Sequence, residues 1–140
     1  MGLKNLIVLI LSVSLITGVT SIAGCVRDEI ATIEDVTPQE AFTLIQNNQN
    51  NSDFVIIDVR TPGEFADGYI ENANNIDFYA TTFREELDNL DKNKTYLIYC
   101  RSGARSGSAL DIMAELNFEE VYNILGGMLQ WQSEEFPTVK

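Results

Sequence analysis

The sequence predicts an α/β fold with a central, mostly parallel sheet and helices on both faces. Three short runs rich in apolar and β-branched residues have the character of strands buried on both faces: 54–59, 95–99 and 121–125. Helical patterns alternate with these runs, at 82–90, 104–116 and 127–135. Strands that alternate with helices imply crossovers between parallel strands, and a chain of 140 residues suits one such domain.

The first 25 residues have the layout of a secretory signal. Lys4 precedes an apolar run over 6–16, and small residues follow it up to Cys25. The segment 22–25 (IAGC) resembles a lipobox, the site at which prokaryotic lipoproteins are cleaved and lipidated on the new terminal cysteine. The alternative is an uncleaved anchor, because residues 5–26 contain no charged side chain.

We therefore expect a lipoprotein-type signal peptide over 1–24, a lipidated Cys25 as the membrane attachment, and a linker over 25–31. The folded domain would then span 32–140. Both the lipoprotein and the anchor place that domain outside the cytoplasm, tethered to a membrane at the cell surface or in a periplasm.

The folded part is expected to open with a strand near 31–33 and then a helix. Thr37 suits the N-cap of this helix, Pro38 its first position, and Glu40 its acidic first turn. The helix ends where the polar, Asn-rich stretch 47–53 begins.

Charge and residue usage exclude several kinds of function. The chain has 9 Lys+Arg against 21 Asp+Glu, a formal net charge of −12, which disfavours nucleic acid as a partner. It contains no histidine, which excludes Cys-His and Ser-His catalysis and His-ligated metal sites. We expect no metal and no cofactor.

Two polar clusters follow neighbouring strands of the predicted sheet. The first is Asp58-Val59-Arg60, and the second is the stretch CRSGAR, residues 100–105. Because ligands of open α/β sheets bind at the carboxyl ends of the strands, the two clusters can share one site.

The second cluster has the features of a reactive cysteine. A helix that starts near Ala104 would direct its free N–H groups at Cys100 and stabilise a thiolate without histidine. Gly103 would let the loop curl tightly, and the planar donor groups of Arg101 and Arg105 suit an oxyanion. The alternative is an inert core cysteine that closes a strand.

Several motifs together resemble the rhodanese-like sulfurtransferase family. They occur in the family's order: DVRTPGEF at 58–65, GYI at 68–70, CRSGARS at 100–106, GGM at 126–128, and Trp131. The resemblance covers about 33–137. The chain departs from the family at 68–76, where GYIENANNI stands in place of the usual GHIPGAxNI.

The resemblance implies an enzyme that carries sulfur as a persulfide on Cys100. The thiolate would take the outer sulfur of a small anionic donor such as thiosulfate and pass it to cyanide or a thiol. The loop residues Arg101, Ser102, Gly103, Ala104 and Arg105 would bind the donor, and Arg105 could also brace the loop.

The resemblance also assigns supporting roles and separates relatives within the fold. Asp58, Arg60 and Glu64 are expected to form a structural polar network beside the pocket. Four residues lie between Cys100 and Arg105; phosphatase and arsenate-reductase relatives have five, so sulfur transfer is the favoured chemistry. Two alternatives remain: a non-catalytic binding or regulatory module, and a carrier that receives sulfur from a partner protein.

Overall fold

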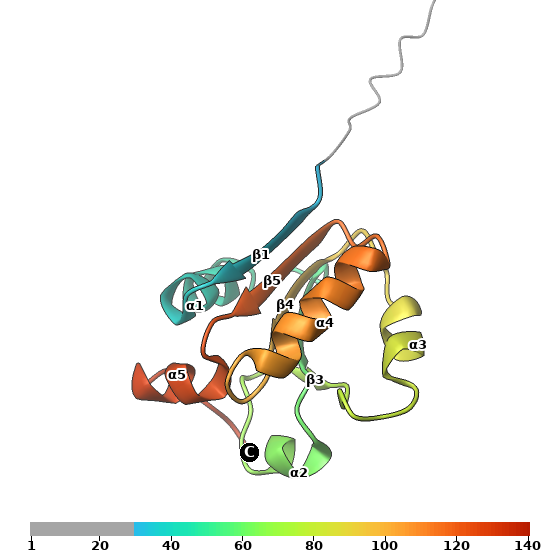
Figure 1. Cartoon of the computed structure of the whole chain (residues 1–140). Coiled ribbons are helices and arrows are strands. Elements are labelled where there is room, and N and C mark those ends of the chain that lie inside the picture. The colour runs from blue at the N-terminus through green and yellow to red at the C-terminus, as the bar shows by residue number, and fades with distance from the viewer. Residues whose placement is uncertain (1–29) are drawn as a thin grey trace, which may run out of the picture.

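Five parallel strands form the centre of the computed structural model, which describes residues 30–140 (Figure 1). Their order in the sheet is β1-β5-β4-β2-β3, and all four neighbouring pairs are parallel. The strands are β1 (Thr32–Val36), β2 (Phe54–Asp58), β3 (Asn74–Asn75), β4 (Thr95–Tyr99) and β5 (Glu120–Ile124). The predicted α/β fold with a parallel sheet is confirmed.

Five helices lie around the sheet: α1 (Pro38–Asn47), α2 (Pro62–Ala66), α3 (Phe83–Asp88), α4 (Ala104–Glu115) and α5 (Gly127–Ser133). Helices α3 and α4 cover one face, while α1 and α5 cover the other (Figure 1). Short α2 lies beyond the carboxyl ends of the strands.

The alternation of side chains along β4 explains how one strand serves two cores. Leu97 and Tyr99 pack with the α1 and α5 side, while Tyr96, Ile98 and then Cys100 pack with the α3 and α4 side. All five side chains are at most 1% exposed. A strand buried on both faces needs a continuous apolar run, and the sequence 95–99 supplies one.

Helix α1 begins as predicted. The Thr37 side chain accepts a hydrogen bond from the Glu40 N–H, the Glu40 carboxylate accepts one from the Thr37 N–H, and Pro38 occupies the first turn. This capping box satisfies two N–H groups that a helix start otherwise leaves unpaired.

The structure adds two elements that were not predicted, α2 and β3. Helix α2 starts with a second capping box, between Thr61 and Glu64, on the sequence TPGE. Helix α1 starts with the similar sequence TPQE, so the same helix-start signal was present at α2. Helix α2 was not predicted because its five residues are too few to show a helical pattern. Strand β3 has only two residues, too few for a hydrophobic period.

The two ends of the sheet have different roles. Ile30, where the described chain begins, lies beside the amino ends of the strands, and Cys100 lies at the carboxyl ends (Figure 1). The predicted signal peptide, Cys25 lipidation and most of the linker fall outside residues 30–140. Among the described residues, no helix combines the length and apolar character required to cross a bilayer.

Candidate active site

Cys100 lies at the junction between β4 and the loop that leads into α4. The strand ends at Tyr99 and α4 begins at Ala104, where the sequence predicted a helix start. The cysteine is a free thiol and is 0% exposed. Its sulfur therefore lies at the base of the loop, at the amino end of a helix of 12 residues.

Hydrogen-bond donors of the loop and of α4 converge on this sulfur. The Gly103 N–H donates to Sγ over 3.1 Å, and the Ser106 hydroxyl lies 3.4 Å from it. Burial raises the pKa of the Cys100 thiol, but donation from Ser106 and from the backbone N–H groups of Ser102 and Gly103 outweighs burial. The net pKa is below the ordinary value, so the site favours a thiolate.

Gly127, the first residue of α5, allows the backbone of this helix to pack against the loop. A Cβ at Gly127 would lie 2.4 Å from the carbonyl oxygen of Cys100, and this residue has φ +55°. The contact lets the N–H groups of Met128 and Leu129 donate to the carbonyls of Cys100 and Arg101, over 2.8 and 3.0 Å. The first turn of α5 therefore binds the backbone carbonyls at the start of the cysteine loop.

Arg105 is held in a two-point ion pair rather than being free in the loop. Its guanidinium donates to both carboxylate oxygens of Glu64, over 2.7 and 2.8 Å. The hydrogen bond from Arg105 is the largest cause that lowers the pKa of Glu64, which falls to about 2. Glu64 likewise raises the pKa of Arg105. The pair ties α2 to the first turn of α4 and so braces the cysteine loop.

Asp58 and Arg60 form a second, more deeply buried pair. They are 0% and 5% exposed, and the Arg60 guanidinium donates to Asp58 and, over 2.7 Å, to the Gly68 carbonyl. Burial lowers the pKa of Arg60, but the hydrogen bonds and charge of Asp58 outweigh it and keep the guanidinium charged. The expected polar network is thus two separate pairs, of which only Glu64–Arg105 reaches the loop.

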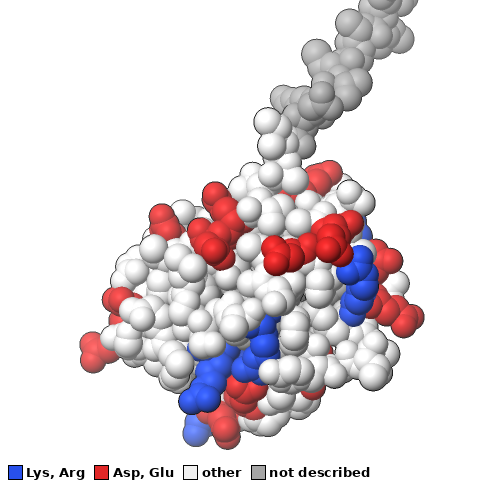
Figure 2. Space-filling view, in the orientation of Figure 1, with Lys and Arg blue, Asp and Glu red and all other residues white. Residues whose placement is uncertain are grey.

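The remaining loop residues face outward. Arg101, Ser102 and Ala104 are exposed, while Gly103 is half-buried and has φ +96°, a conformation that favours glycine. Arg101 makes no ion pair with any residue of the described range 30–140. Figure 2 shows a group of Lys and Arg side chains at the end where α2, α5 and the start of α4 meet, with acidic side chains beside them.

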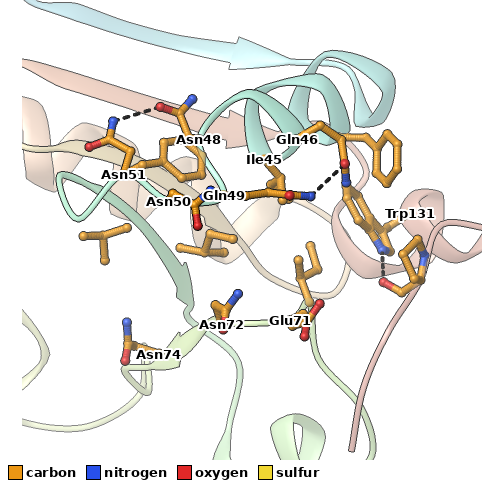
Figure 3. A pocket seen from close by; sticks show the side chains of 16 residues that line it. Ile45, Gln46, Asn48, Gln49, Asn50, Asn51, Glu71, Asn72, Asn74 and Trp131 are labelled. Carbon is orange, nitrogen blue, oxygen red and sulfur yellow. Dashed lines mark hydrogen bonds between the residues drawn. The ribbon is translucent and has the colours of Figure 1, made fainter.

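A separate hollow of about 560 Å³ lies on the α1 and α5 side. Figure 3 shows carboxamides from the chain after α1, including Asn48 and Asn51, across from Asn72 and Asn74. None of its lining residues belongs to the loop 100–106. Cys100 and the loop that follows it therefore do not line this hollow. Among residues 30–140, no group of three metal-ligating side chains could hold a metal ion.

Sequence reasoning did not assign roles to the Ser106 hydroxyl or to Gly127. Ser106 lies one residue beyond the predicted loop, but a residue two positions into a helix start is a natural donor to an anion there. The role of Gly127 depends on a contact between residues 27 positions apart in the chain, which local patterns do not reveal.

Comparisons with known proteins show the family to which the chain belongs. The family model of the rhodanese-like domain matches residues 33–134. A sulfurtransferase of Allochromatium vinosum is 32% identical over 97 residues, which cover 69% of this chain and 89% of that protein. A thiosulfate sulfurtransferase of Coxiella burnetii is 30% identical over 100 residues, covering 71% and 88%.

Solved structures give the same result. A rhodanese-related protein from Thermoplasma volcanium superposes with a TM-score of 0.63 at 26% identity, covering 76% of this chain and 97% of that one. A rhodanese-like domain protein from Staphylococcus aureus gives 0.58 at 32% identity, covering 70% and 90%. The match spans most of the chain and includes the cysteine loop, so this protein belongs to the rhodanese-like domain family.

Proposed function

We propose that this protein is a sulfurtransferase that carries sulfane sulfur on Cys100. The observation that supports this proposal most is that hydrogen-bond donors from Gly103 and Ser106 surround the buried sulfur of Cys100. These donors lower the pKa of the thiol without a histidine. A thiolate is the nucleophile in sulfur exchange, and the same donors can stabilise the negative charge of both the Cys100 thiolate and the persulfide that forms from it. The names of the relatives from A. vinosum and C. burnetii support the same chemistry.

The proposed reaction has two displacement steps on sulfur. In the first, the Cys100 thiolate attacks the outer sulfur of thiosulfate; the S–S bond of the donor breaks, sulfite leaves with the electron pair, and a persulfide remains on Cys100. In the second, cyanide or a thiolate attacks that outer sulfur, and the Cys100 thiolate leaves. No external oxidant or reductant is needed. The first step replaces the S–S bond of thiosulfate by that of the persulfide, and the second replaces the persulfide bond by an S–C bond with cyanide or an S–S bond with a thiol.

The loop residues have distinct parts in this proposal. The Gly103 N–H and the Ser106 hydroxyl, which now face Sγ, would stabilise the negative charge of the persulfide. Exposed Arg101 would bind the oxyanion end of the donor, because Arg105 is already engaged by Glu64. Arg105 would act by positioning the loop. Asp58 and Arg60 would support the strand ends.

Thiocyanate formation from thiosulfate and cyanide tests the proposal. The wild-type chain and a Cys25→Ser variant should turn over at the same rate, and Cys100→Ser should abolish turnover. Turnover that survives in Cys100→Ser would refute the mechanism. A wild-type chain that forms no thiocyanate and gains no sulfur would support a binding or regulatory module instead.

We further propose that the chain is a membrane-attached lipoprotein outside the cytoplasm, modified at Cys25. The support is the sequence of residues 1–25. Because Cys100 lies at the opposite end of the sheet from Ile30, attachment to a membrane through the amino terminus would leave the active site facing away from that membrane. Cys25→Ser should move the protein from the membrane to the soluble fraction. Unchanged membrane association would favour the uncleaved anchor, and a soluble wild-type protein would contradict both.

A further inference from the structure

The hollow on the α1 and α5 side opens along a free edge of the sheet. Strand β3 starts at Asn74, opposite Ile57, so within residues 30–140 the first part of β2 has a neighbouring strand on one side only. This part consists of Phe54, Val55 and Ile56, and all three line the hollow of about 560 Å³. A strand edge without a neighbour can pair with another chain.

Two backbone groups of this edge have no partner in the described part of the chain. The N–H of Val59 donates to β4, whereas the carbonyl of Asp58 accepts from the residue after β3. Because backbone groups point to alternate sides of a strand, Phe54 and Ile56 face the same edge as Asp58. Neither the Phe54 carbonyl nor the Ile56 N–H has a hydrogen-bond partner among residues 30–140. They are an acceptor and a donor two residues apart, which the backbone of an added strand can satisfy together.

Carboxamides that are free to bind a ligand lie on both sides of the hollow. Figure 3 shows Asn72 and Asn74 on one side and Asn50 on the other. Asn51 donates to Asn48, but the side chains of the first three make no hydrogen bond within the described range 30–140. A carboxamide both donates and accepts, so it can bind the N–H and the C=O of a peptide unit.

The apolar and charged residues of the hollow define the side chains that would fit there. Phe42, Ile45 and Phe54 are partly buried, pack against the core on this side and line the hollow. An added strand would direct every second side chain toward them, because side chains alternate along a strand. Glu71 is exposed and is the one charged residue among those that line the hollow. An apolar side chain with a lysine or arginine nearby is therefore complementary to this surface.

We propose that this hollow binds an extended segment of a partner protein, which adds a strand to the free edge of β2. The segment would carry an apolar residue flanked by cationic ones. A neutral sugar could use the carboxamides, but the backbone donor and acceptor of the strand edge match a peptide backbone. The site does not include Cys100 or its loop, so this binding would be a function additional to sulfur transfer.

The test uses the blocked peptide acetyl-Lys-Thr-Leu-Thr-Lys-amide and the isotope-labelled full chain carrying Cys25→Ser. Titration of the peptide to about 5 mM detects a Kd of about 1 mM or tighter by NMR. We expect saturable binding, with the largest shifts at the Ile56 N–H and at the side-chain amides of Asn50, Asn72 and Asn74.

Two N-methylated forms of the peptide test strand addition. An added strand turns alternate N–H groups toward β2, so methylation of both threonine nitrogens and methylation of the leucine nitrogen cannot have the same effect. One of the two should weaken binding about tenfold, because it leaves an acceptor without its donor, and the other should change binding little. Equal effects would overturn strand addition.

A charge-reversed peptide, acetyl-Glu-Thr-Leu-Thr-Glu-amide, tests the role of Glu71. It should bind about threefold to fivefold more weakly than the lysine peptide, because the carboxylate is exposed and screened. Glu71→Gln should remove this preference. Glu119→Gln is the matched control, since Glu119 is exposed beside the amino end of β5 and does not line the hollow, and it should retain the preference.

The remaining outcomes separate this site from the proposed sulfurtransferase. No shift over the titration, or shifts that exclude Ile56, would overturn the peptide site. So would a hollow that binds maltose and not the lysine peptide. Cys100→Ser should bind the peptide as wild type does, so loss of sulfur transfer and loss of peptide binding are independent results.

Discussion

Replacing Gly127 by alanine should disrupt the cysteine loop from beneath. The new Cβ would lie 2.4 Å from the Cys100 carbonyl oxygen and 2.8 Å from that of Arg101, so the backbone must move. Holding alanine at positive φ costs about 1 to 2 kcal/mol. Losing the bond from the Met128 N–H to the Cys100 carbonyl, now 2.8 Å, costs about 1 kcal/mol more. We expect a loss of about 2 to 3 kcal/mol in the free energy of unfolding, measured by urea denaturation.

The same variant should also make Cys100 less reactive. A displaced loop no longer aims its donors at the sulfur, so the thiol pKa rises and the thiolate fraction at neutral pH falls. A rise of one unit would slow alkylation by iodoacetamide about tenfold.

Gly107→Ala is the matched control for this prediction. Gly107 lies inside α4, and a Cβ at this residue would meet no other atom within 4 Å, so alanine there should stabilise the protein by about 0.5 to 1 kcal/mol. A Gly127→Ala protein with wild-type stability and alkylation rate would refute the reasoning, as would an equal loss in Gly107→Ala.

Three further substitutions probe the site itself. Ser106→Ala removes a donor to the sulfur, so the pH midpoint of Cys100 alkylation should shift upward and the rate at pH 7 fall by about threefold to tenfold; an unchanged pH profile would exclude this role. Folding lowers the pKa of Glu64 from 4.5 to about 2. The ion pair of Glu64 with Arg105 therefore stabilises the protein fully above about pH 5, and this stabilisation is lost as the pH falls toward 2. Glu64→Gln should therefore cost about 1 to 2 kcal/mol at pH 7, with the difference from wild type narrowing at pH 3 in urea titrations; a constant difference would contradict the assignment. Arg101→Gln should raise the KM for thiosulfate about tenfold or more at nearly wild-type stability, and an unchanged KM would remove Arg101 from donor binding.

The parts of the fold that the sequence predicted well are those with local causes. A short, continuous apolar run such as 95–99, rich in β-branched and aromatic residues, predicts a strand buried on both faces, and the Thr37 capping box is complete within four residues. The start of α4 at Ala104 followed from the change of pattern after Cys100. These features explain why the α/β class and the location of the cysteine loop could be anticipated.

The details that the sequence did not reveal depend on contacts between distant segments. Glu64 and Arg105 are 41 residues apart, and only the packing of α2 beside α4 brings them together. The same holds for the contact of Gly127 with the Cys100 carbonyl. Strand β3 exists because Asn74 and Asn75 pair with the end of β2, and two residues carry no periodicity of their own.

The most direct test of a persulfide on Cys100 is the intact mass of the Cys25→Ser chain after incubation with thiosulfate and then with cyanide. A gain of about 32 Da that cyanide removes, and that is absent when Cys100 is also replaced by serine, would establish a persulfide on this cysteine. A Cys100 that gains no mass and resists alkylation in the folded protein would contradict the proposed chemistry and identify it as an inert core residue.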